Sequence, residues 1–236
     1  MEEYPHDSDE VLGKSSKRIN RSGRFLFLAG LAIVGGVLSL TLWFASEVLE
    51  GETLAFDEAL RQGVHSMASP LITSFFIGVS FLGSPGFLIG VGVIVISLFF
   101  YFGWRRAAVL FLVTMAGEVI LNLILKNNYA RPRPEPFFDY ALPSSFSFPS
   151  GHALGSFCFY GILAWIISSR LENLAAKRSL RAAAAVLVFF IGVSRIYLGV
   201  HYPTDVLAGF VTGLIWTLSV IISSSFLEGQ TIQIRR

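Results

Sequence analysis

One stretch of the chain, from Phe25 to Ala45, contains no charged residue, and it is long enough to cross a bilayer, which takes about 20 apolar residues in a helix. The whole chain follows this pattern, since 53% of its 236 residues are hydrophobic and 14% are charged. A soluble domain carries about 25% charged residues, and its surface helices show a polar face at the helical period. The apolar segments of this chain show almost no such face. We therefore predict an integral membrane protein.

Further apolar segments suit membrane-spanning helices, but Pro70–Leu82 is short, and runs of about 10–14 residues are more often interfacial or re-entrant. We predict that Phe56–Leu82 forms helices lying near one membrane surface; if this segment spans instead, the topology inverts after it. The predicted fold class is all-α, an integral membrane bundle of six transmembrane helices with short interfacial helices before the second span. The six predicted spans are Phe25–Ala45, Phe87–Phe102, Ala107–Leu125, Ala153–Ser169, Ala182–Val193 and Val206–Phe226.

Lys and Arg in short loops favour the cytoplasmic side of a membrane. With six spans, all four basic clusters of the chain fall on one side, so we predict that both termini are cytoplasmic. The predicted domains are a flexible cytoplasmic segment (1–22), a six-span domain (23–228) and a cytoplasmic tail (229–236). The clusters are Lys14, Lys17, Arg18, Arg21 and Arg24; Arg105 and Arg106; Arg170, Lys177, Arg178 and Arg181; and Arg235 and Arg236.

Composition excludes several other classes of protein. The hydrophobic content excludes a disordered chain. The single cysteine, Cys158, excludes a disulfide framework within the chain. A net charge of +2 is too small to indicate a nucleic-acid surface. The bilayer itself is therefore the predicted partner, and the sequence leaves the oligomeric state open.

Polar residues remain at three span ends on the side opposite the basic clusters. Cations stand there against the positive-inside bias, which suggests that they bind an anion. The three segments are Lys126–Pro134 with Lys126, Arg131 and Arg133; Pro149–His152; and Ser194–Asp205 with Arg195, His201 and Asp205.

These residue types match the chemistry of a phosphate group. Ser150 and Gly151 precede a predicted helix, whose N-terminus offers free N–H groups and the positive end of a dipole. His152 and His201 can serve nucleophilic attack and proton transfer near neutral pH. Asp205 lies four residues after His201, so on one helical face it can accept a hydrogen bond from one ring nitrogen and leave the other aimed at phosphorus.

The three segments together resemble the signature of the type 2 phosphatidic acid phosphatase (PAP2) superfamily. In this chain the signature consists of Lys126…Arg133-Pro134, then Pro149-Ser150-Gly151-His152, then Ser194-Arg195…His201…Asp205. Every position is filled in order, and the spacing selects Arg133 rather than Arg131. The resemblance covers residues 120 to 210, and the six predicted spans are similar to those of the bacterial membrane members.

This resemblance implies a role for each residue. His201 would attack phosphorus to form a phospho-histidine, Asp205 would orient it, and His152 would protonate the leaving group and then activate water. The phosphoryl oxygens would be bound by Lys126, Arg133, Ser150, Gly151 and Arg195. The resemblance implies neither a metal nor a cofactor, and the sequence lacks a metal-binding grouping such as His-Glu-x-x-His.

The expected function is a metal-independent phosphatase that hydrolyses a phosphomonoester or pyrophosphate of a membrane lipid, of the phosphatidic acid or phosphatidylglycerol phosphate type. The enzyme would lie in the bacterial cytoplasmic membrane with its site on the extracytoplasmic face. One alternative is an undecaprenyl pyrophosphate phosphatase that recycles a cell-wall carrier lipid. Another is an anion transporter, although that function does not explain the spacing of His201 and Asp205.

Other polar residues are assigned simpler roles. We expect Arg131 to solvate its loop or contact lipid head groups, and Tyr202 to lie in the interfacial aromatic belt. His65 is expected at the surface. A carboxylate such as Glu118 inside a span marks function by default, but here pairing with Asn122 is preferred.

Overall fold

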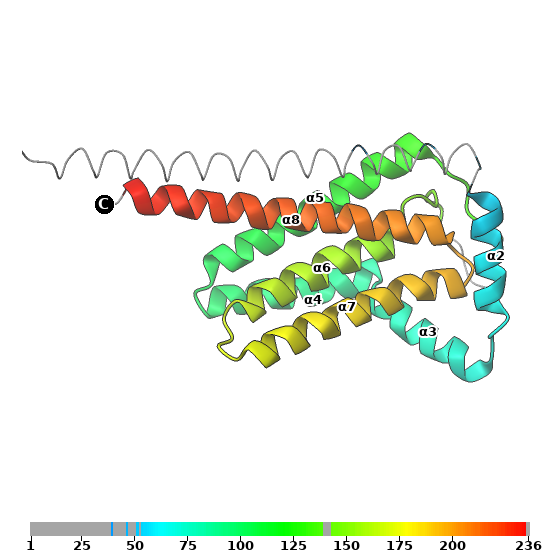
Figure 1. Cartoon of the computed structure of the whole chain (residues 1–236), viewed down its shortest axis with the longest axis horizontal. Coiled ribbons are helices and arrows are strands. Elements are labelled where there is room, and N and C mark those ends of the chain that lie inside the picture. The colour runs from blue at the N-terminus through cyan, green and yellow to red at the C-terminus, as the bar shows by residue number, and fades with distance from the viewer. Residues whose placement is uncertain (1–38, 40–45, 47–50, 52, 139–142, 235–236) are drawn as a thin grey trace, which may run out of the picture.

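The computed structural model describes residues 39, 46, 51, 53–138 and 143–234, with side chains described as far as Ser225. Within these residues every regular element is a helix, and most of the helices run side by side in one bundle (Figure 1). The predicted all-α membrane fold is confirmed at this level. The predicted span Phe25–Ala45 and the segment 1–22 lie outside the described residues.

Four of the predicted spans form helices long and apolar enough to cross a membrane. These helices are α5 (Arg105–Tyr129), α6 (Gly151–Ser168), α7 (Leu174–Tyr197) and α8 (Pro203–Ile234). The predicted span Phe87–Phe102 forms α4 (Pro85–Tyr101), whose 17 residues fall short of the roughly 20 that a span needs. The total of six spans is therefore not confirmed within the described chain, where four or five candidates are found.

The segment predicted to lie near a membrane surface forms two helices, α2 (Leu54–His65) and α3 (Pro70–Leu82). The axes of α2 and α3 differ by 119°, as in a broken span or a re-entrant loop. In Figure 1, α2 lies across one end of the bundle and α3 turns back along it. The position of this pair relative to the bilayer stays a prediction.

Capping residues fix where several of these helices begin. Ser69 accepts a hydrogen bond from the Ile72 N–H at the start of α3, and Ser84 accepts one from the Phe87 N–H at the start of α4. Each serine is followed by proline, whose fixed φ suits the first helical position. Two Ser-Pro pairs therefore separate α2, α3 and α4.

Helix α6 lies at the centre of the bundle and packs against α4, α5, α7 and α8. Gly209 of α8 allows a close approach to the start of α6, since a Cβ at this position would lie 2.8 Å from the Ser150 carbonyl oxygen. Small residues allow helices in membranes to approach in this way. The second turn of α8 is consequently held against the start of α6.

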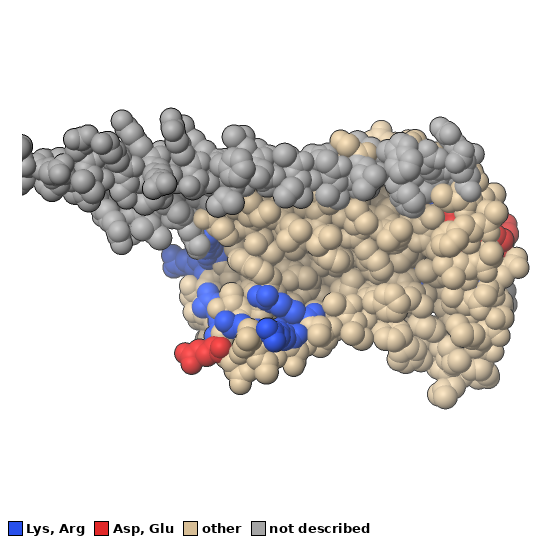
Figure 2. Space-filling model, viewed as in Figure 1, with Lys and Arg blue, Asp and Glu red and all other residues tan. Residues whose placement is uncertain are grey.

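The two basic clusters in the described part of the chain, 105–106 and 170–181, lie at the opposite end of the helices from the three predicted motifs. Lys and Arg side chains gather at the end of the molecule where α5 begins and α6 connects to α7 (Figures 1 and 2). The motif residues lie at the other ends of α5, α6 and α7. Because α5 has 25 residues, these two ends are about 37 Å apart, enough to cross the hydrocarbon core.

Candidate active site

Helix ends bring the three motifs together. Lys126 lies in the last turn of α5, and Ser150 is the N-cap of α6. Arg195 lies in the last turn of α7, and Asp205 lies in the first turn of α8. His201 occupies the connection between α7 and α8, where Gly199 takes a φ of 75° that favours glycine.

A cavity of about 590 Å³ collects most of the predicted site residues. His152 and His201 line the same cavity, as the proposed chemistry requires. The apolar part of its wall comes from α4 and α5. The predicted residues that line it are Lys126, Arg133, Gly151, His152, Arg195 and His201.

Two predicted residues lie outside the cavity lining. Asp205 is fully buried and contacts His201. Ser150 is also fully buried, and its Oγ has no hydrogen-bond partner among the residues that the structure describes. Its backbone N–H donates to the Asp205 carbonyl oxygen at 3.0 Å, which ties the second motif to the third.

The His201 ring is held at both nitrogens. Nε2 lies 3.1 Å from Arg133 Nη1, and because arginine has only donors, Nε2 is assigned as the acceptor. Nδ1 then carries the proton and lies 3.3 Å from Ser147 Oγ and 3.5 Å from Asp205 Oδ2. Ser147 Oγ in turn donates to Asp205 Oδ2. The unprotonated nitrogen is therefore the one on the Arg133 side of the ring.

The surroundings of His201 keep its ring neutral. Burial lowers the pKa of His201 to about 3; Asp205 opposes this shift, whereas Arg133 and Arg195 add to it. A neutral imidazole has the free electron pair that a nucleophile needs. His201 is therefore neutral at pH 7, which is the form that the predicted nucleophile role requires.

The three predicted phosphate-binding cations are anchored by oxygen atoms. Lys126 Nζ donates to the Phe146 carbonyl, and Arg133 donates to the Val200 carbonyl at 2.9 Å. Arg195 is 1% exposed and donates from Nη1 to Ser80 Oγ on α3. These contacts fix the cations around the cavity, where positive charge and forked donors suit a phosphoryl group.

The predicted role of Arg131 is wrong. Arg131 is 6% exposed, and it forms ion pairs with Asp57 and with Asp205. The physical reason is that a buried carboxylate such as Asp205 needs a partner. Tyr202, predicted in an interfacial belt, is half-buried, and the Arg131 guanidinium lies 4.1 Å from its ring centre.

Two other simple assignments also differ from the structure. His65 is half-buried, and its ring stacks on Phe137 with centroids 4.1 Å apart. Glu118 is buried and lines the cavity, but no hydrogen bond joins it to Asn122 in the described part of the chain. Asn122 instead lies beside Gly151, where a Cβ would approach its Nδ2 to 3.0 Å.

Sequence reasoning missed Ser147, Ser80 and Asp57. Ser147 stands just before the second motif, so its nearness to Ser150 and His152 was a usable signal. Ser80 and Asp57 precede the first motif by many residues, and only folding brings them to the site.

Across the described ranges, no three His, Cys, Asp or Glu side chains are placed to hold a metal ion. Metal independence itself stays a prediction, which a chelator tests directly.

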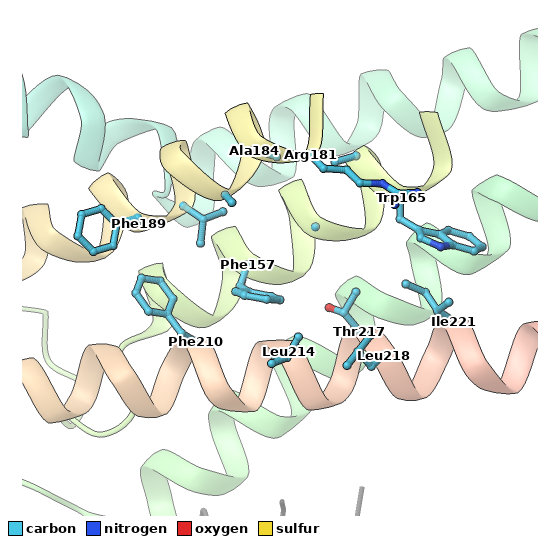
Figure 3. A pocket seen from close by; sticks show the side chains of 14 residues that line it. Phe157, Trp165, Arg181, Ala184, Phe189, Phe210, Leu214, Thr217, Leu218 and Ile221 are labelled. Carbon is cyan, nitrogen blue, oxygen red and sulfur yellow. The ribbon is translucent and has the colours of Figure 1, made fainter. Parts of the chain in front are cut away.

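A second cavity, of about 410 Å³, lies between α6, α7 and α8 (Figure 3). Apolar side chains including Phe157, Phe210 and Leu218 surround it, and Arg181 supplies a charge. None of the predicted site residues lines this cavity, so it is separate from the candidate active site.

Comparison with known proteins gives a consistent result. The profile of the PAP2 superfamily matches residues 107–227. Phosphatidylglycerophosphatase B of Bacillus subtilis is 33% identical over 182 residues, covering 75% of this chain and 89% of that protein. An undecaprenyl-diphosphatase of Sulfolobus acidocaldarius is 30% identical, covering 51% of this chain and 57% of that protein.

A solved structure has the same fold. It is the crystal structure of a transmembrane PAP2 type phosphatidylglycerolphosphate phosphatase from Bacillus subtilis. The two chains superpose with a TM-score of 0.75 at 30% sequence identity, over 81% of this chain and 96% of that one.

Proposed function

The chain belongs to the PAP2 superfamily of lipid phosphatases, and from that premise we propose that it hydrolyses the phosphomonoester of a glycerophospholipid, of the phosphatidylglycerol phosphate or phosphatidic acid type, through a phospho-histidine. The cavity is the observation that carries this proposal. Its polar part holds His152, His201 and the three cations, and its apolar part lies between α4 and α5. A lipid phosphate has the same two parts.

The proposed reaction starts with the phosphoryl group bound by Lys126, Arg133 and Arg195. His201 Nε2 attacks phosphorus, a P–N bond forms and the ester P–O bond breaks. The leaving alkoxide takes a proton from the imidazolium form of His152, which becomes neutral. The proton on Nδ1 stays with the Ser147–Asp205 side, where Asp205 stabilises the charge that develops on the ring.

Hydrolysis of the intermediate reverses these roles. His152 takes a proton from water, the resulting hydroxide attacks phosphorus and the P–N bond breaks. The products are the dephosphorylated lipid and inorganic phosphate, and His201 returns to its neutral form. The cations stabilise the phosphoryl charge throughout.

We also propose that the site faces the extracytoplasmic side of a bacterial cytoplasmic membrane. Support comes from the positive-inside rule, because the Lys and Arg of the connections gather at the opposite end of the bundle (Figure 2). Substrate would enter sideways from the lipid, head group at the surface.

Phosphate release from a panel of lipids, measured on purified protein in detergent with EDTA, tests this proposal. We expect release from phosphatidylglycerol phosphate or phosphatidic acid in the wild type and none above background in His201→Ala, with an unchanged melting temperature. Faster turnover of undecaprenyl pyrophosphate would favour the carrier-lipid alternative instead. Lack of release from every lipid phosphate would refute the proposal.

The covalent step has its own test. His152→Ala lacks the group that activates water, so with an aryl phosphate, whose leaving group needs no proton from His152, a phosphorylated His201 should accumulate. Mass spectrometry of the protein under alkaline conditions, in which phosphohistidine survives, measures it. An unmodified His201 in an otherwise active enzyme would contradict the covalent route.

A further inference from the structure

Asp57, on α2, is a buried carboxylate that lies outside both the three motifs and the segment 107–227 that matches the superfamily profile. Its exposed fraction is 0%. Oδ1 accepts a hydrogen bond from the Thr204 N–H at 2.9 Å, and Oδ2 accepts one from Thr204 Oγ1 at 2.7 Å. Thr204 lies between Pro203 and Asp205, in the first turn of α8. Asp57 therefore holds the backbone next to a predicted catalytic residue.

Arg131 connects Asp57 to the active site. Its Nη2 donates to Asp57 Oδ2 at 2.8 Å, and its Nη1 donates to Asp205 Oδ1 at 2.6 Å. The rigid guanidinium fork thus binds two carboxylates that come from α2 and α8. Burial lowers the pKa of Arg131, but Asp205 and Asp57 outweigh it, so the pKa is raised and the charge is kept.

The two oxygens of Asp205 have different partners. Oδ1 faces Arg131, whereas Oδ2 faces His201 and accepts from Ser147 Oγ. The Tyr202 N–H also donates to Oδ2, at 2.9 Å, so Arg131 at Oδ1 acts together with Ser147 and Tyr202 at Oδ2 to fix the rotation of the Asp205 carboxylate and the oxygen presented to the imidazole. Nη1 of Arg131 also donates to Thr204 Oγ1 at 2.9 Å, whereas Nη2 donates to Asp57, so Asp57 holds the second arm of the guanidinium fork.

We propose that Asp57 is a positioning residue for the phosphatase reaction, acting through Arg131 on the Asp205–His201 pair. This role rests on the proposed function, because it concerns the nucleophile of that reaction. Asp57 touches neither the cavity lining nor His201, so its removal should affect the chemical step more than substrate binding.

Asp57 could instead have a purely structural role, that of docking α2 on the bundle. A control variant on the same helix distinguishes this role from the positioning role. Arg61 is 3% exposed; it donates to the Glu135 carbonyl at 2.6 Å and lies 4.5 Å from the Phe137 ring centre. Arg61→Gln therefore loosens the contacts of α2 while leaving the Asp57–Arg131–Asp205 connection in place.

The experiment measures kcat, KM and melting temperature for the wild type, Asp57→Asn, Arg131→Gln, the double variant and Arg61→Gln. We expect kcat of Asp57→Asn to fall about 10- to 100-fold, the scale of a small misplacement of reacting groups. KM should stay within about twofold, because the interactions that bind the substrate equally in the ground state and the transition state are unchanged. The double variant should be little worse than Arg131→Gln, because the two residues act through one connection.

Two results would overturn this role in an active enzyme: a kcat for Asp57→Asn no lower than for Arg61→Gln, or fully additive losses in the double variant. A wild type that releases phosphate from no lipid would instead overturn the proposed function, and this role with it. If Asp57→Asn does not fold, Arg131→Lys gives the test, since it keeps the charge but cannot bind both carboxylates. A kcat for that variant equal to the wild-type value would contradict the proposal.

Discussion

The His201 ring is oriented before any substrate arrives. Arg133 lies at one nitrogen, and Ser147 and Asp205 lie at the other. The side chain is 2% exposed, so these contacts hold the ring in one direction with little competition from water. Such preorganisation removes part of the entropic cost of reaching the transition state.

The guanidinium of Arg195 should be essential for its shape as well as its charge. In Arg195→Lys a single ammonium replaces a planar fork that already binds Ser80. We expect kcat/KM to fall about 10- to 100-fold, equivalent to about 1.4–2.7 kcal/mol of transition-state stabilisation. Steady-state phosphate release on the purified variant measures it.

Arg170→Lys is the matched control for this substitution. Arg170 lies at the other end of the bundle, with its guanidinium 3.7 Å from the Trp104 ring centre. The same chemical change there should leave kcat/KM at the wild-type value. Near-native kinetics in Arg195→Lys would show that Arg195 does not bind the phosphoryl group through its fork.

Helices α4 and α5 form the apolar wall of the active-site cavity. Val93 and Ile89 of α4 and Val119 of α5 line it, and each is more than half exposed. In a bilayer we expect lipid tails to reach these side chains. The cavity therefore extends from the polar motifs to the lipid-facing surface, which suits a substrate whose chains stay in the membrane.

Filling the apolar wall should affect long-chain substrates selectively. Val93→Trp places a bulky ring at the cavity wall, so KM should rise several-fold for a long-chain phosphatidic acid and change little for a short-chain one. Ile94→Trp is the control, because the neighbouring residue is 59% exposed and is not part of the cavity lining. Equal effects of the two variants on both substrates would contradict entry between α4 and α5.

The molecule as a whole has two chemically different ends. Lys and Arg side chains gather where α5 begins and α6 connects to α7 (Figure 2), and the active-site cavity lies toward the other end. The helices between these ends are long enough to cross a bilayer. By the positive-inside rule, this arrangement supports the proposal that the active site faces the extracytoplasmic side.

Cysteine labelling in intact cells tests this orientation. The natural Cys158 is fully buried, so it should give little background. A membrane-impermeant maleimide should label Ser144→Cys in intact spheroplasts, and Arg178→Cys only after permeabilisation, since both positions are exposed but lie at opposite ends. The reverse pattern would place the site in the cytoplasm.

Much of the fold could be predicted from local sequence patterns. Where a predicted helix boundary was wrong, the cause is also local. The predicted span Ala182–Val193 belongs to a helix that begins at Leu174, because backbone hydrogen bonds continue through polar residues after the apolar run has ended. The Asn173 cap, which accepts from the Ala175 and Ala176 N–H groups, sets that start. Hydropathy reports the lipid-facing length of a helix and not its ends.

The sequence by itself determined the membrane class, the helices that carry the three motifs and the candidate residues, since each rests on spacing along one stretch of chain. Only the tertiary structure decided which partners hold those residues. Asp57 and Arg131 are 74 positions apart, and Ser80 and Arg195 are 115 apart, so no periodicity links them. Burial decides these pairings, because a charge removed from water takes whichever partner the fold brings within reach.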